Sequence, residues 1–259
     1  MSRGPCPVCA RGARDTALSI TTDERGTVEH CFRCGYTSTE NYEHRPDTFA
    51  DPSTPPRDWS TKAERIWCRT RPLRGSLGEV YLRARGCVLP PADGDLRYLA
   101  GSERHPPTLC ARITDAITAR PISLHFTHLA ADGTAKAGST DPHKPDKHPL
   151  AGHRKRGGVI RLWSAVTHSL GIAEGIESAL GLAHLHTPVW SAIDAGNLAA
   201  LPVLAGIECL VIFADYDRTG IRDAQRCAHR WRAAGREVTV WRSKTAGEDA
   251  ADIARRVSA

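Results

Sequence analysis

Four of the nine cysteines in this 259-residue sequence lie close together near its start. They form two C-x2-C pairs, Cys6/Cys9 and Cys31/Cys34, with 21 residues between the pairs. Each pair can present two thiolates on one side of a turn, and the strand-like residues between the pairs would bring the turns together, which is typical of tetrahedral Zn2+. We therefore expect one structural Zn2+ in a four-cysteine zinc ribbon, a unit too small to fold well without metal.

The sequence also allows other roles for the residues of this segment. The four residues could be ordinary reduced cysteines, and His30 could replace a neighbouring cysteine as ligand. Adjacent residues of a strand point to opposite faces, so we prefer Cys31 together with Cys34. The arginines of this segment predict a positive surface suited to nucleic acid, or simply a solvated basic face.

Carboxylates follow two predicted strands in the last third of the sequence. Glu174 comes after the apolar run 169–173, and Asp215 and Asp217 come after the apolar run 209–214. Because strands alternate with helices here, we expect a parallel sheet whose carboxyl ends meet at one edge. Carboxylates gathered there repel one another unless cations neutralise them, and hard oxygen ligands select Mg2+ or Mn2+. Further candidate ligands are Asp249 and Asp252.

The fold class that we predict is multidomain, with α+β and α/β parts. Residues 37–60 contain four prolines and hardly an aliphatic side chain, which predicts a flexible linker. Alternation of apolar and polar residues over 122–127 and a helical pattern over 77–84 predict a mixed α+β region. The predicted boundaries are 1–36 for the ribbon, 37–60 for the linker, 61–166 for the α+β subdomain and 167–259 for the domain with a parallel central sheet.

Basic residues are in modest excess, with a formal net charge of +6 that favours polyanionic partners. The densest basic stretch predicts a catalytic role for Lys147 and contacts with nucleotide or template, although a mobile loop that only attracts template is an equal alternative. With Lys147, the candidate contacts in this stretch are Lys144, Arg154, Lys155 and Arg156. Second candidates are Arg83, Arg85 and Arg97, of which the first two could simply be an exposed helix face.

The sequence contains no apolar run of about 18 residues and no apolar leader after Met1, so we expect a cytoplasmic protein with no membrane partner.

Several motifs together resemble a known family. The stretches AEGIES, SAIDAGNLAAL, VIFADYDRTG and GEDAADI are similar to the Toprim domain of primase-type proteins, from residue 168 to about 255. The cysteine segment resembles the zinc-binding domain of bacterial and phage DNA primases. The stretches YLRARG and LRY resemble the first half of the polymerase core found in phage and plasmid proteins. Cys9 stands where one version of the family has histidine, but four-cysteine versions also belong to it.

The resemblance implies a DNA primase, a DNA-dependent RNA polymerase that makes short primers on single-stranded DNA by two-metal-ion nucleotidyl transfer. Glu174, Asp215 and Asp217 match the metal-binding acids of the family, and Asp249 matches a later acidic position for which Asp252 competes. The expected partners are single-stranded DNA and nucleoside triphosphates. A replicative helicase would act in trans, because the sequence contains no G-x-x-x-x-G-K-[ST] phosphate loop.

Two other functions fit the same residues. A Toprim-type nuclease would use the same acids for metal-dependent hydrolysis. A non-catalytic single-stranded-DNA-binding replication factor would keep the scaffold without synthesis, although three mutually repelling acids would then serve no purpose. A topoisomerase would need a much longer chain.

Overall fold

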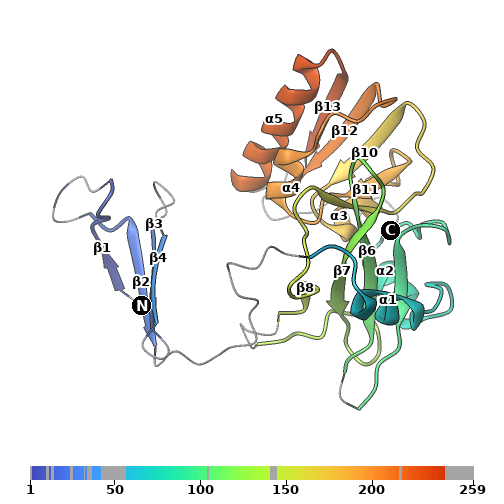
Figure 1. Ribbon diagram of the computed structural model, residues 1–259, viewed down its shortest axis with the longest axis horizontal. Coiled ribbons are helices and arrows are strands. Elements are labelled where there is room, and N and C mark those ends of the chain that lie inside the picture. The colour runs from blue at the N-terminus through green and yellow to red at the C-terminus, as the bar shows by residue number, and fades with distance from the viewer. Residues whose placement is uncertain are drawn as a thin grey trace. The chain divides into compact units, whose positions relative to one another are not determined.

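The structure is a computed structural model whose description covers residues 2–9, 12, 15–23, 26–31, 33, 37–41, 57–103, 105–140, 145–215 and 218–242. The chain divides into two compact units, Met1–Phe49 and Ala50–Ala259, which are drawn in Figure 1. No described helix is both long enough and apolar enough to cross a bilayer.

The first unit is a four-stranded antiparallel sheet in the order β1-β2-β3-β4. Its described core is small, since the buried apolar residues are Cys6, Leu18 and Cys31. A sheet with so little apolar interior needs another source of stability, as small domains generally do. The strands are β1 (Ser2–Gly4), β2 (Leu18–Asp23), β3 (Gly26–Cys31) and β4 (Thr37–Asn41).

Strand β4 differs from the prediction made for this part of the chain. The sequence predicted that a linker begins at residue 37, but Thr37–Asn41 pairs with β3 in antiparallel register. The prediction relied on the low hydrophobicity of this segment. Threonine nevertheless fits a pleated strand well, and pairing satisfies the outer backbone groups of β3. The other predicted domain boundaries stay predictions.

The second unit is built on one nine-stranded mixed sheet with the order β13-β12-β10-β11-β9-β6-β7-β8, and β5 pairs with β6 beside it. Strands β10 to β13 are parallel, whereas β9 is antiparallel to both β11 and β6 and thereby joins the two halves. The strands are β5 (Leu96–Leu99), β6 (Thr108–Asp115), β7 (Pro121–His128), β8 (Lys147–Pro149), β9 (Gly158–Arg161), β10 (Ser169–Ala173), β11 (Val189–Ser191), β12 (Cys209–Ala214) and β13 (Glu237–Arg242).

Five described helices cover the faces of this sheet (Figure 1). Helices α4 and α5 pack with β10 and β12 around one core cluster, which contains Ile172 and Trp231. Helices α2 and α3 share the other large cluster, in which Tyr81 and Leu180 lie in the same core. One apolar core therefore joins the two halves of the second unit. The helices are α1 (Thr61–Cys68), α2 (Leu77–Ala84), α3 (Ile176–Leu182), α4 (Ala195–Ala200) and α5 (Arg218–Ala233).

Local signals explain where these helices begin and end. Ser60 and Ser76 precede α1 and α2, and each side chain accepts a hydrogen bond from a backbone N–H of the first turn. Gly86 follows α2 with a positive φ of 68°, a conformation that glycine adopts without steric cost.

Strand β7 is buried on both faces, which the alternating sequence did not predict. Leu124 and Phe126 pack against α1, while Ser123, His125 and Thr127 are buried on the opposite face. The polar residues of this strand therefore lie inside the unit.

Candidate active site and metal centre

Three cysteine sulfur atoms of the first unit lie close enough to bind one ion. The Sγ atoms of Cys6, Cys9 and Cys31 all lie within 4.8 Å of one another, and those of Cys9 and Cys31 are 3.6 Å apart. Thiolates at about 2.3 Å from a tetrahedral Zn2+ are about 3.7 Å apart, so this arrangement fits zinc. Cys34, the fourth predicted ligand, lies outside the described residues.

Arg33 supports this cysteine cluster. Its guanidinium pairs with both carboxylate oxygens of Asp15, at 2.5 and 2.7 Å, and it also donates to the carbonyl oxygen of Cys9. The bond with Asp15 raises the pKa of Arg33 above its ordinary value. This arginine therefore links the first cysteine turn to Asp15, and its charge is partly neutralised there.

Glu174 and Asp215 lie at the ends of neighbouring parallel strands. Strands β10 and β12 pair directly, with Ala173 opposite Phe213, so both strands end at the same edge of the sheet (Figure 1). Glu174 follows β10 and Asp215 follows β12. The structure thus brings two of the predicted metal ligands to one edge. Asp217, Asp249 and Asp252 lie outside the described residues, so their places stay predictions.

Neighbouring groups hold the backbone and side chain of these two acids. The buried Ser191 on β11 donates its hydroxyl proton to the carbonyl oxygen of Glu174 at 2.9 Å. Ser178 on α3 donates to Oδ1 of Asp215 at 3.0 Å. A Cβ added to Gly220 would lie 2.9 Å from the carbonyl oxygen of Asp215, so only glycine allows the first turn of α5 to pack this closely. The acids are therefore positioned by β11, α3 and α5.

Glu177 is a charged residue of this region that the sequence analysis missed. It is buried in the first turn of α3, and its carboxylate binds Tyr81 Oη at 2.7 Å and Lys147 Nζ at 2.8 Å, with Lys136 Nζ at 3.7 Å. Burial alone would raise its pKa, but the attraction of Lys147 and Lys136 and the two hydrogen bonds lower the pKa to about 2. Glu177 is therefore an anion at neutral pH.

This ion cluster lies next to Glu174 along the chain. A Cβ added to Gly175 would lie 3.8 Å from Oε2 of Glu177, the oxygen that accepts from Lys147. The buried carboxylate thus brings Lys147, from the edge strand β8, to the start of α3. The only signal for Glu177 in the sequence is a second carboxylate three residues after Glu174.

His125 lies on the same face of the sheet as this cluster. It is buried, and burial and the charge of Lys147 lower its pKa to about 4, although Glu177 acts in the opposite direction. Its Nδ1 atom has no hydrogen-bond partner among the described residues. His125 is therefore neutral at pH 7, and it does not compete with the lysines for Glu177.

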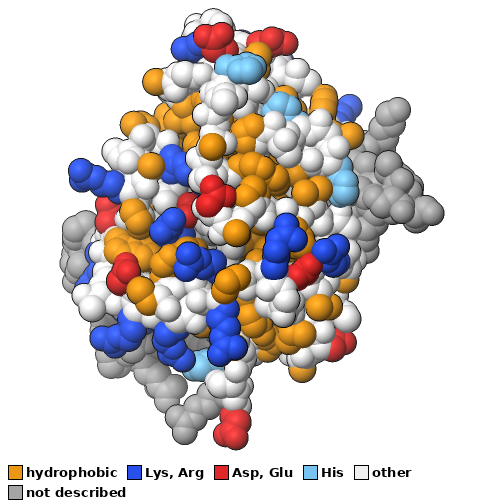
Figure 2. Space-filling view, turned by 90° about the vertical axis from the view of Figure 1, so that its right-hand side faces the viewer, with side chains coloured by type: hydrophobic (Ala, Val, Ile, Leu, Met, Phe, Trp, Pro, Cys, Tyr) orange, Lys and Arg blue, Asp and Glu red, His pale blue; other side chains and the backbone are white. Residues whose placement is uncertain are grey.

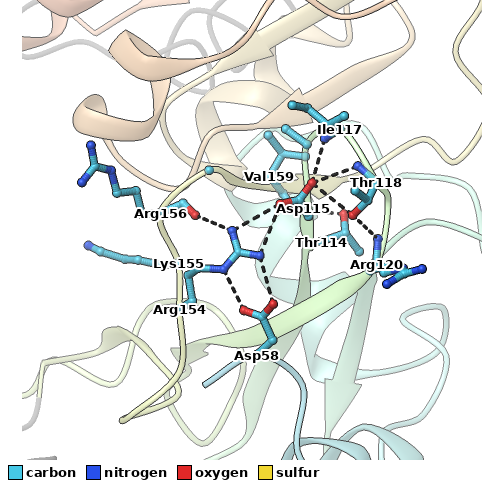
Figure 3. A network of polar contacts seen from close by, with 12 residues as sticks. Asp58, Thr114, Asp115, Ile117, Thr118, Arg120, Arg154, Lys155, Arg156 and Val159 are labelled. Atoms are coloured by element: carbon cyan, nitrogen blue, oxygen red, sulfur yellow. Dashed lines mark hydrogen bonds and ion pairs between the residues drawn. The ribbon is translucent and has the colours of Figure 1, made fainter. Parts of the chain in front are cut away.

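Ion pairs hold Arg154 and Lys155 of the basic segment 154–156, and Figure 3 shows those of Arg154. Arg154 binds Asp58 at 2.7 Å and Asp115 at 3.2 Å, and Lys155 binds Asp194 at 2.8 Å. Asp194 is also the N-cap of α4, so the segment is tied to that helix. The side chain of Arg156 is exposed and points away from the network in Figure 3.

The other basic candidates have separate surroundings. Arg83 forms an exposed pair with Glu79 one turn earlier on α2, and Arg97 lies over the ring of Trp67 at 4.7 Å. Arg85 is half-buried at the end of α2, on the side of Tyr81 and Lys136. Lys144 lies outside the described residues. Arg83 and Arg97 are thus engaged away from the Glu177 cluster.

Comparisons with known proteins define the class to which this fold and site belong. The Toprim domain family matches residues 169–259, and a domain family of unknown function, DUF7146, matches residues 57–161. No curated protein matches the sequence. Residues 169–259 therefore form a Toprim domain.

Three solved structures resemble the whole chain or large parts of it. The zinc-binding and RNA polymerase domains of the Aquifex aeolicus primase match with a TM-score of 0.52 and 14% identity, covering 98% of this chain and 75% of that one. A DNA primase domain from Pseudomonas aeruginosa matches with a TM-score of 0.41 and 16% identity, covering 78% and 60%. The DnaG catalytic core matches with a TM-score of 0.41 and 18% identity, covering 57% and 48%.

The chain thus spans about half of the DnaG core structure and three fifths of the Pseudomonas domain. Residues 169–259 belong to the Toprim domain family, and the chain as a whole shares its fold with the zinc-binding and RNA polymerase domains of the Aquifex aeolicus primase. The predicted resemblance to the Toprim domain and the predicted fold class are confirmed.

Proposed function

We propose that this protein is a DNA primase that synthesises short RNA primers on single-stranded DNA. The observation that carries the proposal is the pair Glu174 and Asp215 at the ends of adjacent parallel strands inside a Toprim domain. The three-cysteine cluster and the fold shared with a primase support it. The cysteine cluster favours a primase over a nuclease, and the carboxylates favour an enzyme over a simple binding protein.

The acids would hold Mg2+ or Mn2+, with Asp217 as the expected third ligand. Bound divalent cations lower the pKa of an attacking 3'-hydroxyl and neutralise charge on the phosphates. Ser191 fixes the backbone of Glu174 and Ser178 orients Asp215, so these groups are positioned before substrate arrives. Glu174 is also a candidate general base for the attacking hydroxyl.

Lys147 would contact the triphosphate from the side of the site that faces Glu177. Glu177 keeps Lys147 extended toward the start of α3, and the side chain of Lys147 remains 37% exposed. A cation held in this way can approach a phosphate without a large loss of side-chain freedom. Lys136 would add a second charge at 3.7 Å from the same carboxylate.

Template DNA would bind to basic surfaces. Lysine and arginine side chains gather with apolar side chains between them in the lower half of the face shown in Figure 2. Such a mixture suits single strands, because cations track the phosphates and flat apolar side chains accept bases. A cysteine-rich unit on the same chain could add contacts to the template, and a separate helicase would supply the single strand.

A primer-synthesis assay tests this proposal. The protein is incubated with single-stranded DNA, labelled ribonucleotides and Mg2+ or Mn2+, in parallel with Glu174→Gln, Asp215→Asn and the exposed control Glu103→Gln. We expect template-dependent oligoribonucleotides from the wild type and the control, and at least a 100-fold loss in the two acid variants.

The products also separate the other functions. Shortened template that depends on Glu174 would indicate a nuclease. Template binding without any product, at matched folding by circular dichroism, would indicate a non-catalytic binding factor. Either result would overturn the primase proposal.

A further inference from the structure

Two histidines face each other at the edge of the sheet, away from the Toprim acids. His128 is the last residue of β7, and His148 is the middle residue of the edge strand β8. Their Nε2 atoms are 3.1 Å apart and their ring centroids 5.1 Å apart. This pair had no role in the sequence analysis.

Hydrogen bonds determine which ring nitrogen of each histidine carries a proton. His148 Nδ1 lies 3.2 Å from the carbonyl oxygen of Pro149, which can only accept, so Nδ1 must be the donor. The hydroxyl of Thr108 donates its single proton to the carbonyl of Pro106. Thr108 must therefore accept from Nδ1 of His128, at 2.8 Å. In each neutral ring Nε2 is then unprotonated, and its lone pair faces Nε2 of the other ring.

Two lone pairs at this distance repel each other unless a positive species lies between them. A shared proton or a bound metal ion can supply that positive charge. Two imidazole nitrogens that each lie about 2.0–2.1 Å from one ion, with N–metal–N angles of about 90° to 109°, are about 2.8–3.4 Å apart. The observed separation of 3.1 Å lies in this range.

We propose that His128 and His148 chelate one late first-row divalent metal ion, with Zn2+ as the ion of choice. The Nδ1 donors to Thr108 and Pro149 act as metal-binding histidines usually require, because they orient each ring and fix its tautomer. Both rings are half-buried, which leaves the remaining coordination positions to water. Asp146 does not compete as a ligand, since its two oxygens accept from the backbone of Gly138 and Ser139.

The ion would clamp a short strand that carries a functional residue. Strand β8 has three residues and pairs only with β7 among the described strands. Side chains alternate along a strand, so His148 lies on the face of Phe126 while Lys147 points to the opposite face and Glu177. Fixing His148 to His128 would therefore hold Lys147 in place. The metal site itself does not depend on the proposed primase activity.

Calorimetric titration with Zn2+ tests the site on the full chain. The protein is first loaded with one zinc per chain at the cysteines, verified by elemental analysis, and kept in millimolar Mg2+ to occupy the acids. We expect one further Zn2+ to bind with a dissociation constant in the micromolar range. His128→Asn and His148→Asn should each weaken it at least tenfold, because the asparagine amide keeps the Nδ1 hydrogen bond but lacks Nε2.

Two further variants sharpen the result. Thr108→Val should weaken the second zinc severalfold by freeing the ring of His128, whereas the exposed control His229→Ala should leave it unchanged. The proposal would be overturned if the loaded protein bound no second zinc. It would also be overturned if the second zinc bound both asparagine variants as tightly as the wild type. A shared proton between the rings, seen as a joint titration of the pair by NMR without zinc uptake, would also overturn it.

Discussion

The two units of this protein are stabilised in opposite ways. The described part of the first contains three buried apolar residues, two of which are cysteines whose sulfur atoms lie within the span of one ion. The second contains two large apolar clusters that cover both faces of a continuous sheet, and it buries the charge of Glu177 beside Tyr81 of α2. Metal ligation would therefore carry the stability of the small unit, whereas in the large unit apolar burial allows a charged site to be held in the interior.

Removal of a cysteine should have the largest effect, and it should be confined to the first unit. In Cys31→Ser we expect loss of the zinc and unfolding of residues 2–41, because zinc binding to such sites is worth about 10–16 kcal/mol and is coupled to folding. The thermal transition of the second unit should not move. Zinc content and NMR dispersion measure this, with the exposed Cys68→Ser as control.

The proposed contrast between a metal-stabilised first unit and an apolar second unit would be wrong if Cys31→Ser kept its zinc with unchanged affinity. It would also fail if the second unit lost stability to the same extent, because the two units would then not be independent in folding.

Neutralisation of Glu177 should have the next largest effect, within the second unit. Glu177→Gln leaves two lysines near a buried amide, and breaking a fully buried pair typically costs 3–5 kcal/mol. The side chains of Lys147 and Lys136 are 37% and 38% exposed, so they can regain water in the variant. We therefore expect the free energy of unfolding to fall by about 2–3 kcal/mol. Urea unfolding measures this loss, with the surface pair variant Glu79→Gln as a control that should change the free energy of unfolding much less.

A double variant separates a charge effect from a packing effect. If Glu177 acts by binding Lys147, then Glu177→Gln with Lys147→Met should cost clearly less than the sum of the two single changes. Additive costs would show that the cluster is only a packed part of the core.

Acid should weaken the second unit through the same carboxylate. The pKa of Glu177 is about 2 in the folded state, below the ordinary value of 4.5, so the folded state binds fewer protons than the unfolded state between these values. Its contribution is present above about pH 4.5 and is lost as pH falls toward 2.

Free energies of unfolding between pH 6 and pH 2.5 measure this dependence. Glu177→Gln should show a shallower slope below pH 4.5 than the wild type. Equal slopes in the two proteins would contradict the assignment of a charged Glu177.

The surface network at Arg154 should give the smallest effect. Asp58→Asn removes one of two acids that bind Arg154, and the side chain of Asp58 is 55% exposed. Exposed pairs contribute about 0.2–1 kcal/mol, so we expect Asp58→Asn to lower the free energy of unfolding by an amount in that range, and the difference should disappear at high salt. Urea unfolding of the variant and the wild type at low and high salt measures this difference. A loss above about 2 kcal/mol would mean that charge, rather than apolar burial, holds this part of the unit.

The sequence indicated the local elements of the site better than its long-range contacts. Glu174 and Asp215 were predicted to meet because each follows an apolar strand, and parallel strands end at a common edge. Glu177 was missed because its partner Lys147 is 30 residues away, and no periodic pattern connects a helix to an edge strand over that distance. The same holds for Arg154, whose partner Asp58 is 96 residues away.

By itself, the sequence determined the cysteine pairs and the order of strands and helices in the last third of the chain. These follow from spacing and periodicity, which are local properties of the chain, whereas the likeness to the Toprim domain came from the resemblance of whole motifs. Only the tertiary structure decided that Lys147 binds Glu177, that Arg154 is used in a surface network and that His128 faces His148. Such contacts depend on which faces of distant elements pack together, and packing is set by the whole core rather than by any one segment.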